Sequence, residues 1–224
     1  MKKLILPLLL LIAFGMLAAV ESDPSEVVGY FKLDIAENQW QAISMPFDYG
    51  TNPPVLDVLG MQFSENDYCM DINTLDGATF YAGYGWDGLL TEMQYGSSYF
   101  VNRAAGNGAG TYYLLGAVDP NGFTKTIYGN GAWTAFGLNE AADVTLTDDL
   151  FGTAETENDY VMEINTLDGA TYYAGYGWDG LLTAIHPHEG YYYNTVGIAD
   201  FSWTYAPTRG GATQPSMSNN KNSK

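Results

Sequence analysis

The chain contains one 27-residue segment twice. Residues 65–91 and residues 157–183 are identical at 24 positions with a constant offset of 92 residues, and the differences are mild: Cys69/Val161, Asp71/Glu163 and Phe80/Tyr172. A repeat of this length predicts two structurally similar units packed together. Duplicated binding or assembly surfaces are common in such chains, whereas duplicated active sites in one short chain are rare. The repeat therefore favours a non-catalytic function.

Local sequence signals within each unit are those of β-structure. Aromatic and β-branched residues cluster in short runs bounded by Gly, Asn, Asp and Pro. Hairpins are predicted at residues 67–82 and 159–174, with the Asp-Gly pair of each taking up positive φ in the turn. The glycine-rich residues 83–88 predict a shaped loop rather than a strand, and only residues 54–60 and 147–152 predict one or two helical turns. We expect an all-β, or β-dominated, fold made of two tandem modules.

The ends of the chain differ in composition from its centre. Lys2 and Lys3 precede an apolar run over residues 4–20, which predicts a signal peptide at residues 1–22, with an uncleaved anchor helix as the alternative. Residues 23–120 and 121–206 are the predicted modules. Residues 207–224 are polar and predict a disordered tail. This organisation predicts a secreted protein, extracellular or at the cell surface, with no membrane span in the mature chain.

Charge and cysteine content narrow the possible partners. The net charge is −18, and only Lys32, Arg103 and Lys125 lie between residues 21 and 206, together with all 26 acidic residues. Such a field disfavours nucleic-acid binding and suits cations, basic partners or neutral glycans, although it also serves plain solubility. Cys69 is the only cysteine, so an intrachain disulfide is excluded, and its counterpart Val161 predicts a buried thiol, with an intermolecular disulfide as the alternative.

The glycine-rich loop is the first candidate site, because an indole beside a carboxylate can stack on a sugar and bond to its hydroxyl groups. Its residues recur in both copies: Tyr84, Trp86 and Asp87, then Tyr176, Trp178 and Asp179. The alternative is that both tryptophans are apolar plugs of the module cores. If both loops bind glycan, the protein is bivalent.

The hairpin turn is the second candidate site, for calcium, because its side chains supply hard oxygen ligands. The residues are Asp71, Asn73 and Asp76, then Glu163, Asn165 and Asp168. The same residue types are also ordinary hairpin-turn chemistry. His186, Pro187, His188 and Glu189 have no ligand counterpart in the first copy and predict an exposed turn. Hydrolase, metalloprotease and phosphate-loop motifs are absent from the sequence, so we expect neither an enzyme nor a cofactor.

Three short motifs resemble those of an uncharacterised tandem module of secreted bacterial proteins. They are Val28-Gly29-Tyr30-Phe31-Lys32, Ile43-Ser44-Met45-Pro46-Phe47 and Gly190-Tyr191-Tyr192-Tyr193-Asn194. The second copy departs from the pattern, with Phe136-Gly137-Leu138-Asn139 in place of the Pro-Phe strand. The resemblance implies export and a β fold, and it implies no activity.

Two functional hypotheses follow from the sequence. The first is a secreted, non-catalytic structural or assembly protein of the cell surface or extracellular matrix, with itself or other surface proteins as partners. The second is a glycan-binding protein that uses the repeated Tyr/Trp loops. Exposure of Trp86 and Trp178 discriminates between them most directly.

Overall fold

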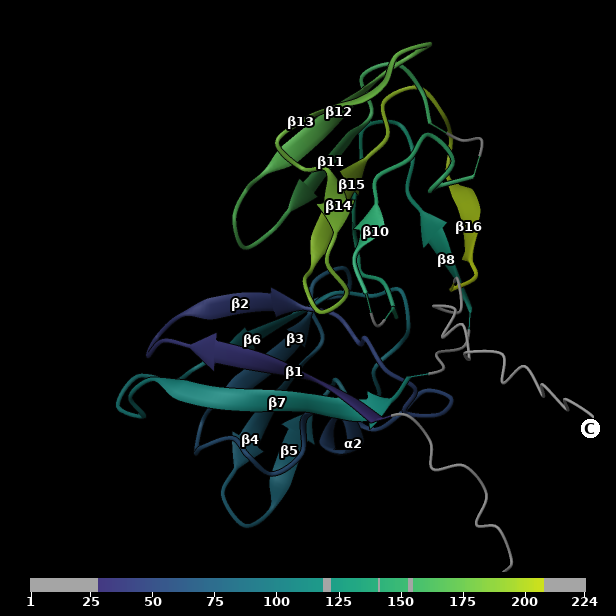
Figure 1. The fold of residues 1–224 in the computed structure, drawn as a ribbon. Helices are drawn as coiled ribbons and strands as arrows, with labels where there is room; N and C mark the ends of the chain where they lie inside the picture. Colours follow the sequence, from purple (N-terminus) through teal and green to yellow (C-terminus); the bar gives the residue numbers. More distant parts are fainter. Residues whose placement is uncertain (1–27, 119–121, 141, 153–154, 208–224) are drawn as a thin grey trace, which may run out of the picture.

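The computed structural model describes residues 28–118, 122–140, 142–152 and 155–207 (Figure 1). The predicted signal peptide and nearly all of the predicted tail lie outside these residues. Antiparallel strands dominate the described chain, whose one helix is the five-residue α2 (Val55–Leu59), so the expected all-β fold is confirmed. No described helix has the length and apolar character that a membrane crossing requires.

Module 1 consists of a five-stranded sheet and a two-stranded ribbon. The sheet order is β2-β6-β3-β4-β5, and the ribbon is β1-β7, with every neighbouring pair antiparallel. The strands are β1 (Val28–Ile35), β2 (Trp40–Ile43), β3 (Tyr68–Asp71), β4 (Gly77–Tyr81), β5 (Gly85–Gly88), β6 (Tyr99–Asn102) and β7 (Gly110–Ala117).

Module 2 repeats this topology. Its five-stranded sheet has the order β9-β15-β11-β12-β13, its ribbon is β8-β16, and a short additional pair joins β10 to β14. The strands are β8 (Phe123–Ile127), β9 (Trp133–Phe136), β10 (Val144–Thr145), β11 (Tyr160–Glu163), β12 (Gly169–Tyr173), β13 (Gly177–Gly180), β14 (Ala184–Ile185), β15 (Tyr191–Asn194) and β16 (Phe201–Tyr205). The prediction of two similar tandem modules is confirmed.

Each module has a hydrophobic core of its own, formed by alternate residues of its strands. In β3 and β11 every second side chain is buried, because successive side chains of a strand point to opposite faces, and the buried ones in β3 are Cys69 and Asp71 rather than the larger Tyr68 and Met70. Cys69 and Val161 are fully buried at equivalent positions. The predicted buried thiol is confirmed, and its burial raises the pKa of Cys69.

Three local predictions differ from the structure. The segment predicted to be a shaped loop contains strand β5, which pairs with β4, and β13 does the same in module 2. Positive φ falls on Leu75 and Leu167 rather than on the Asp-Gly pairs. Gly77 is required for another reason, because a Cβ there would lie 1.7 Å from the hydroxyl oxygen of Tyr68. Residues 147–152 form turns instead of a helix.

The two modules meet through reciprocal contacts at the edge strands β2 and β9. Asn165 of module 2 accepts a hydrogen bond from the Ala42 N–H (2.7 Å) and donates one to the Ala42 carbonyl (2.8 Å). Asn73 of module 1 makes the same two bonds to Ala135, at 2.8 and 2.9 Å. Each asparagine therefore satisfies backbone groups of the other module's edge strand, which would otherwise be open to pairing.

A second reciprocal pair of bonds continues the junction. The Ser44 N–H donates to the His188 carbonyl, and the equivalent Gly137 N–H donates to the Gly96 carbonyl. Between these bonds lies a small apolar cluster made of equivalent residues from both modules: Ala42 and Ala135, Ile72 and Ile164, Phe100 and Tyr192. Each module thus forms with the other the same hydrogen bonds that the other forms with it. Reciprocal contacts of this kind are typical of two-fold symmetric pairing, here between two modules of one chain.

Candidate ligand-binding surfaces

The residues of the predicted glycan loop point to three different places. Tyr84 and Tyr176 lie at the tips of the β4–β5 and β12–β13 hairpins and are 74% and 77% exposed. Trp86 and Trp178 are half-buried and face the cores. Asp87 and Asp179 lie on the outer face of the sheets and are exposed. The structure thus does not bring the three side chains of each copy into one site.

Each repeated tryptophan closes one end of a module core. Trp86 packs edge-on against Phe63 and Phe80, with ring centroids 5.0 and 5.4 Å apart, and its Nε1 donates to the Gly60 carbonyl. Trp178 packs edge-on against Phe151 and Tyr172, with ring centroids 6.2 and 5.4 Å apart. These contacts match the alternative interpretation of the loop, in which both indoles are core plugs.

The predicted calcium turns hold the junction together. Asn73 and Asn165 use their side-chain oxygens on the backbone of the other module, as described above. Asp71 Oδ1 accepts from the N–H groups of Asn73 and Thr74, which closes the turn. Asp76 and Asp168 are half-buried. Among the described residues, no group of three or more His, Cys, Asp and Glu side chains is placed to hold a metal ion. Calcium binding stays a prediction.

Glu163 replaces Asp71 in the second turn and lies in a different electrostatic environment. Its side chain is buried, and this burial, followed by the nearby Glu189 carboxylate, raises the pKa of Glu163. His186 lies close by and pairs with Asp143 at 2.9 Å; that hydrogen bond raises the pKa of His186. The junction therefore concentrates titratable groups on its module 2 side.

The histidine turn contributes to the junction more than the sequence predicts. The ring of His188 stacks on Phe31 of module 1, with centroids 4.5 Å apart, and its Nε2 lies 3.2 Å from Glu189 Oε1. Its equivalent in module 1 is Gly96, so no alignment of the two repeats reveals this contact. The segment is less exposed than predicted: the side chains of His186 and His188 are 43% and 24% exposed, and Pro187 is buried.

A row of five side chains crosses the outer face of each sheet. Strand register places Trp40 opposite Asn102, Asn102 opposite Tyr68, Tyr68 opposite Thr79, and Thr79 opposite Asp87. Directly opposed residues share one face of a sheet. Module 2 has the same residue types in the same register: Trp133, Asn194, Tyr160, Thr171 and Asp179. We call these the outer-face rows.

The tryptophan at the end of each outer-face row is fixed but not covered. Trp40 contacts the rings of Tyr68 and Phe100 edge-on, with centroids 6.0 and 5.9 Å apart, and Trp133 makes the matching contacts with Tyr160 and Tyr192. Both tryptophans remain 49% exposed. Asn102 Nδ2 donates to the Gln39 carbonyl and thereby braces the turn that precedes Trp40.

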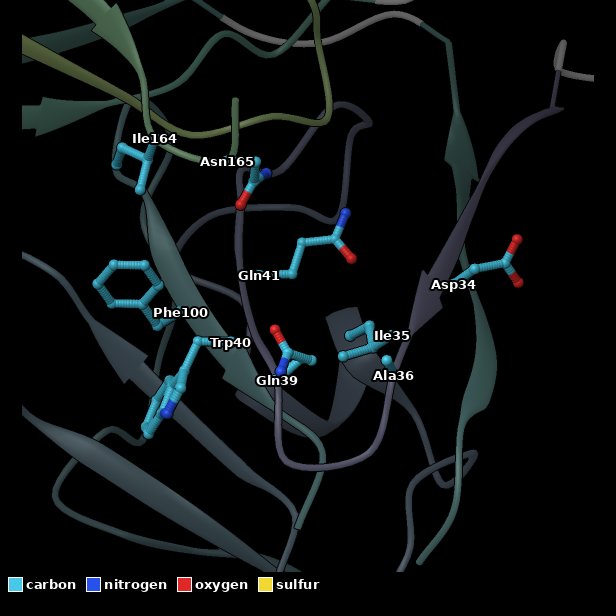
Figure 2. A pocket seen from close by; sticks show the side chains of 9 residues that line it. All are labelled: Asp34, Ile35, Ala36, Gln39, Trp40, Gln41, Phe100, Ile164 and Asn165. Carbon is cyan, nitrogen blue, oxygen red and sulfur yellow. The ribbon is translucent and has the colours of Figure 1, made fainter. Parts of the chain in front are cut away.

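Cavities lie beside both tryptophans. A cavity of about 390 Å³ runs along β2 between Trp40 and the junction, and Figure 2 shows the amides of Gln39, Gln41 and Asn165 around it. A second cavity of about 340 Å³ is lined by Trp133, Met162 and Tyr192. The two cavities differ in polarity, because the first is bordered by side-chain amides and the second by aromatic rings and a thioether.

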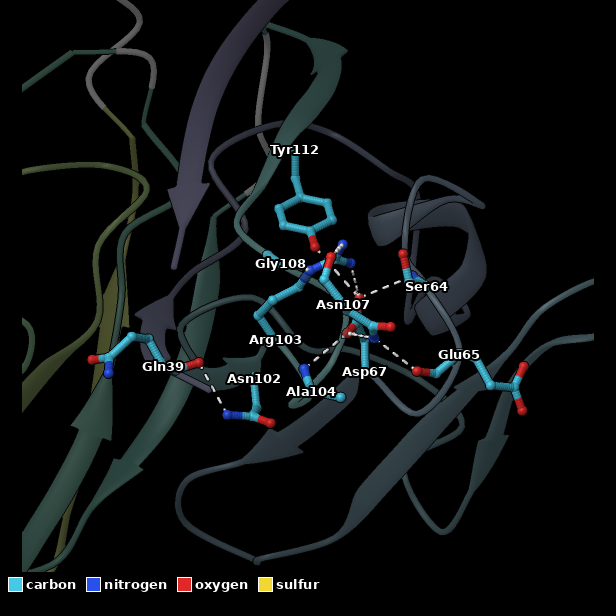
Figure 3. A network of polar contacts seen from close by, with 10 residues as sticks. All are labelled: Gln39, Ser64, Glu65, Asp67, Asn102, Arg103, Ala104, Asn107, Gly108 and Tyr112. Atoms are coloured by element: carbon cyan, nitrogen blue, oxygen red, sulfur yellow. Dashed lines mark hydrogen bonds and ion pairs between the residues drawn. The ribbon is translucent and has the colours of Figure 1, made fainter. Parts of the chain in front are cut away.

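A buried charge network anchors the end of the sheet in module 1 (Figure 3). Arg103 Nη1 lies 2.7 Å from Asp67 Oδ2, and both side chains are almost fully buried. The Asp67 carboxylate also accepts from the backbone N–H groups of Ser64 and Ala104 and from the Asn107 amide. In module 2, Asp159 occupies the equivalent position, but Thr195 stands in place of the arginine and a Tyr193 hydroxyl bonds to the carboxylate.

Comparison with known proteins adds no name to these surfaces. No protein-family model, curated protein or solved structure matches the chain. The resemblance to a secreted tandem module therefore stays an expectation.

The outer-face rows were not predicted from the sequence. Their residues come from five strands and lie between Trp40 and Asn102 in the first repeat and between Trp133 and Asn194 in the second, so only the register brings them together. One signal was present: Trp40 and Trp133 recur at equivalent positions outside the near-identical block, as do Asn102 and Asn194.

Proposed function

We propose that this protein is an exported, non-catalytic structural or assembly protein of the cell surface or extracellular matrix. In this proposal two like modules are held in one fixed body and present like contacts at both ends. The body binds copies of itself or other surface proteins through those ends.

The arrangement of the hairpin tips supports the proposal. The turns at residues 72–76 and 164–168 contact the opposite module, and β4 and β12 run from these turns away from the junction, so the tips lie at the two far ends (Figure 1). Each tip exposes two tyrosines: Tyr84 and Tyr176 are 74% and 77% exposed, and Tyr81 and Tyr173 are each 40% exposed. A large apolar side chain exposed at both ends of one body suits a connector.

Sedimentation velocity over a wide concentration range tests this function. The wild type should form growing oligomers, because each chain has two tips. The single-tip variant Tyr81→Ser/Tyr84→Ser should stop at small assemblies, and the matching change at Tyr173 and Tyr176 should do the same. The variant with all four changes should be monomeric. A wild-type chain that stays monomeric at the highest concentrations would count against self-assembly.

Glycan binding through the repeated loops is less well supported. The tryptophan of each loop packs on its core, and the tyrosine and the aspartate lie on different surfaces, so the loop does not present an indole to a sugar ring. The proposed function therefore rests on the tips and leaves the outer-face rows unassigned.

A further inference from the structure

We propose that the two outer-face rows bind an uncharged polysaccharide, one stretch of chain on each module. This inference goes beyond assembly through the tips and uses different residues. It rests on the side chains that the strand register aligns, on their free polar groups and on the charge around them.

Each outer-face row has aromatic rings at one end and hydrogen-bonding groups at the other. Trp40 and Tyr68 lie on the strands on either side of Asn102 and contact each other edge-on, and Thr79 and Asp87 follow. Neighbouring strands lie about 4.8 Å apart, so a row crossing five strands is roughly 19 Å long. That is the length of a short oligosaccharide. Pyranose rings have apolar faces that stack on indole and phenol rings, and equatorial hydroxyl groups that need polar partners.

The polar groups of the outer-face rows are free to take a ligand. Within the described residues, no hydrogen bond engages the hydroxyl of Tyr68, the hydroxyl of Thr79 or the carboxylate of Asp87, and the same is true of Tyr160, Thr171 and Asp179. A sugar hydroxyl can both donate and accept, so it can satisfy a carboxylate and a hydroxyl side by side. Six such groups in two matched sets favour a polyhydroxylated ligand over an apolar one.

Charge restricts the ligand to an uncharged polymer. Each row ends in an aspartate, and the chain as a whole carries −18. The described lysines and arginine are engaged elsewhere: Lys32 with Asp34, Arg103 with Asp67 and Lys125 with Ser97. Sulfated or uronic-acid polymers would meet only repulsion along these faces.

The placement of the rows allows one polymer to use both. The next residues along the same faces, Phe100 and Tyr192, belong to the apolar cluster at the junction, so each outer-face row lies beside the junction. The amide-lined cavity extends from Trp40 to Asn165 of the other module. Two weak sites on one rigid body raise the apparent affinity for a repeating polymer well above that of either site.

Affinity electrophoresis in native gels containing mixed-linkage β-glucan, xylan or galactomannan tests the proposal. At least one of these neutral polymers should retard the wild type, and polygalacturonate should not. Trp40→Ala/Trp133→Ala should lower the affinity at least tenfold. Titration with a hexasaccharide of the retarding polymer should give two binding sites in the wild type. It should give one site in the single variant Trp40→Ala and one in Trp133→Ala. The control Tyr84→Ser/Tyr176→Ser should be retarded like the wild type.

A second variant guards against a loss of folding. Thr79→Lys/Thr171→Lys leaves all aromatic rings in place and puts a long side chain with a charged ammonium group at the middle of each row. This variant should also abolish retardation, while its melting temperature stays close to that of the wild type. Lack of retardation by all three neutral polymers would overturn the proposal. Equal retardation of the wild type and the folded lysine variant, or retardation by polygalacturonate alone, would do the same. Sedimentation of these variants reports separately on assembly through the tips.

Discussion

The side-chain amide of Asn73 pairs with the N–H and carbonyl of Ala135 as a neighbouring β-strand would. The bonds measure 2.8 and 2.9 Å, and Asn165 repeats them on Ala42. The CONH2 group presents its acceptor oxygen and one of its two N–H donors on the same side, so a single side chain can bond to both the N–H and the carbonyl of one residue at an exposed strand edge.

Removing either asparagine amide should weaken the junction. Asn73→Ala leaves the buried Ala135 N–H and carbonyl without partners, and we expect a loss of about 2 kcal/mol in the free energy of unfolding. Asn165→Ala should cost a similar amount. Asn73→Asp keeps the shape but sets a carboxylate against the Ala135 carbonyl, so it should be at least as destabilising. Urea denaturation of the three variants checks this, and an Asn73→Asp variant as stable as the wild type would contradict it.

The strained leucines of the hairpin turns should be replaceable with a gain in stability. Leu75 and Leu167 have φ values of 64° and 67° and are 66% exposed, so they lose little by removal of the side chain. Leu75→Asn should raise the free energy of unfolding by about 1 kcal/mol, because asparagine tolerates this backbone region better. Leu89→Asn is the matched control: its leucine is also highly exposed, at 79%, but lies outside the positive-φ region, and the change should give no gain.

Removing the guanidinium of Arg103 from the buried Arg103–Asp67 ion pair should strongly lower the stability of module 1. Arg103→Met strands the Asp67 carboxylate in the interior, and we expect a loss of about 3–5 kcal/mol. Lys32→Met removes an ion pair at the surface and should leave stability nearly unchanged. Thermal unfolding monitored by tryptophan fluorescence compares the two. Similar melting temperatures for both variants would show that hydrogen bonds alone hold Asp67.

The junction should lose stability as the pH rises from acid to neutral. The pKa of Glu163 lies above its ordinary value of 4.5 in the folded state, so the folded protein holds this proton more tightly and loses that advantage as the pH rises through the folded pKa. The pKa of His186 lies above 6.5, so its contribution to the free energy of unfolding is also lost as the pH rises, but at higher pH than that of Glu163.

Glu163→Gln isolates the first of these two groups. The glutamine cannot ionise beside Glu189, so the free energy of unfolding of the variant should rise relative to that of the wild type as the pH increases above 4.5. The dependence that the variant still shows above pH 6.5 should belong mainly to His186. Denaturation midpoints at five pH values measure the difference. The exposed Glu92→Gln serves as the control. A constant difference across the range would contradict the assignment.

The sequence predicted the repeat, the β fold, the hairpins and the burial of Cys69, because each depends on local periodicity or on comparing the two copies. It did not predict that Asn73 spans the junction, since that role depends on the position of a strand 62 residues away. The prediction of positive φ at the Asp-Gly pair was wrong for a related reason. Gly77 is needed because the ring of Tyr68, on the neighbouring strand, lies against it, and the residue with positive φ is Leu75.

The outer-face rows show the same limit for the site. A search for aromatic residues close together in sequence finds Tyr84 and Trp86, which point in different directions along a twisted hairpin. Trp40 and Tyr68 are 28 positions apart in the sequence. Their rings are in contact because both residues lie opposite Asn102 of β6, one on each side of that strand. Surfaces built across a sheet become visible only when the strand order is known.

The reciprocal junction carries one more implication, for ancestry. A contact set in which each half supplies what the other needs is already complete for two identical partners, so a lone module with an asparagine turn and an open edge strand could have paired with a second copy of itself. Joining two such genes end to end would have turned a pairing that depends on concentration into one built into every chain. The copies would then have been free to diverge, as Arg103 and Thr195 have, while the asparagines stayed the same.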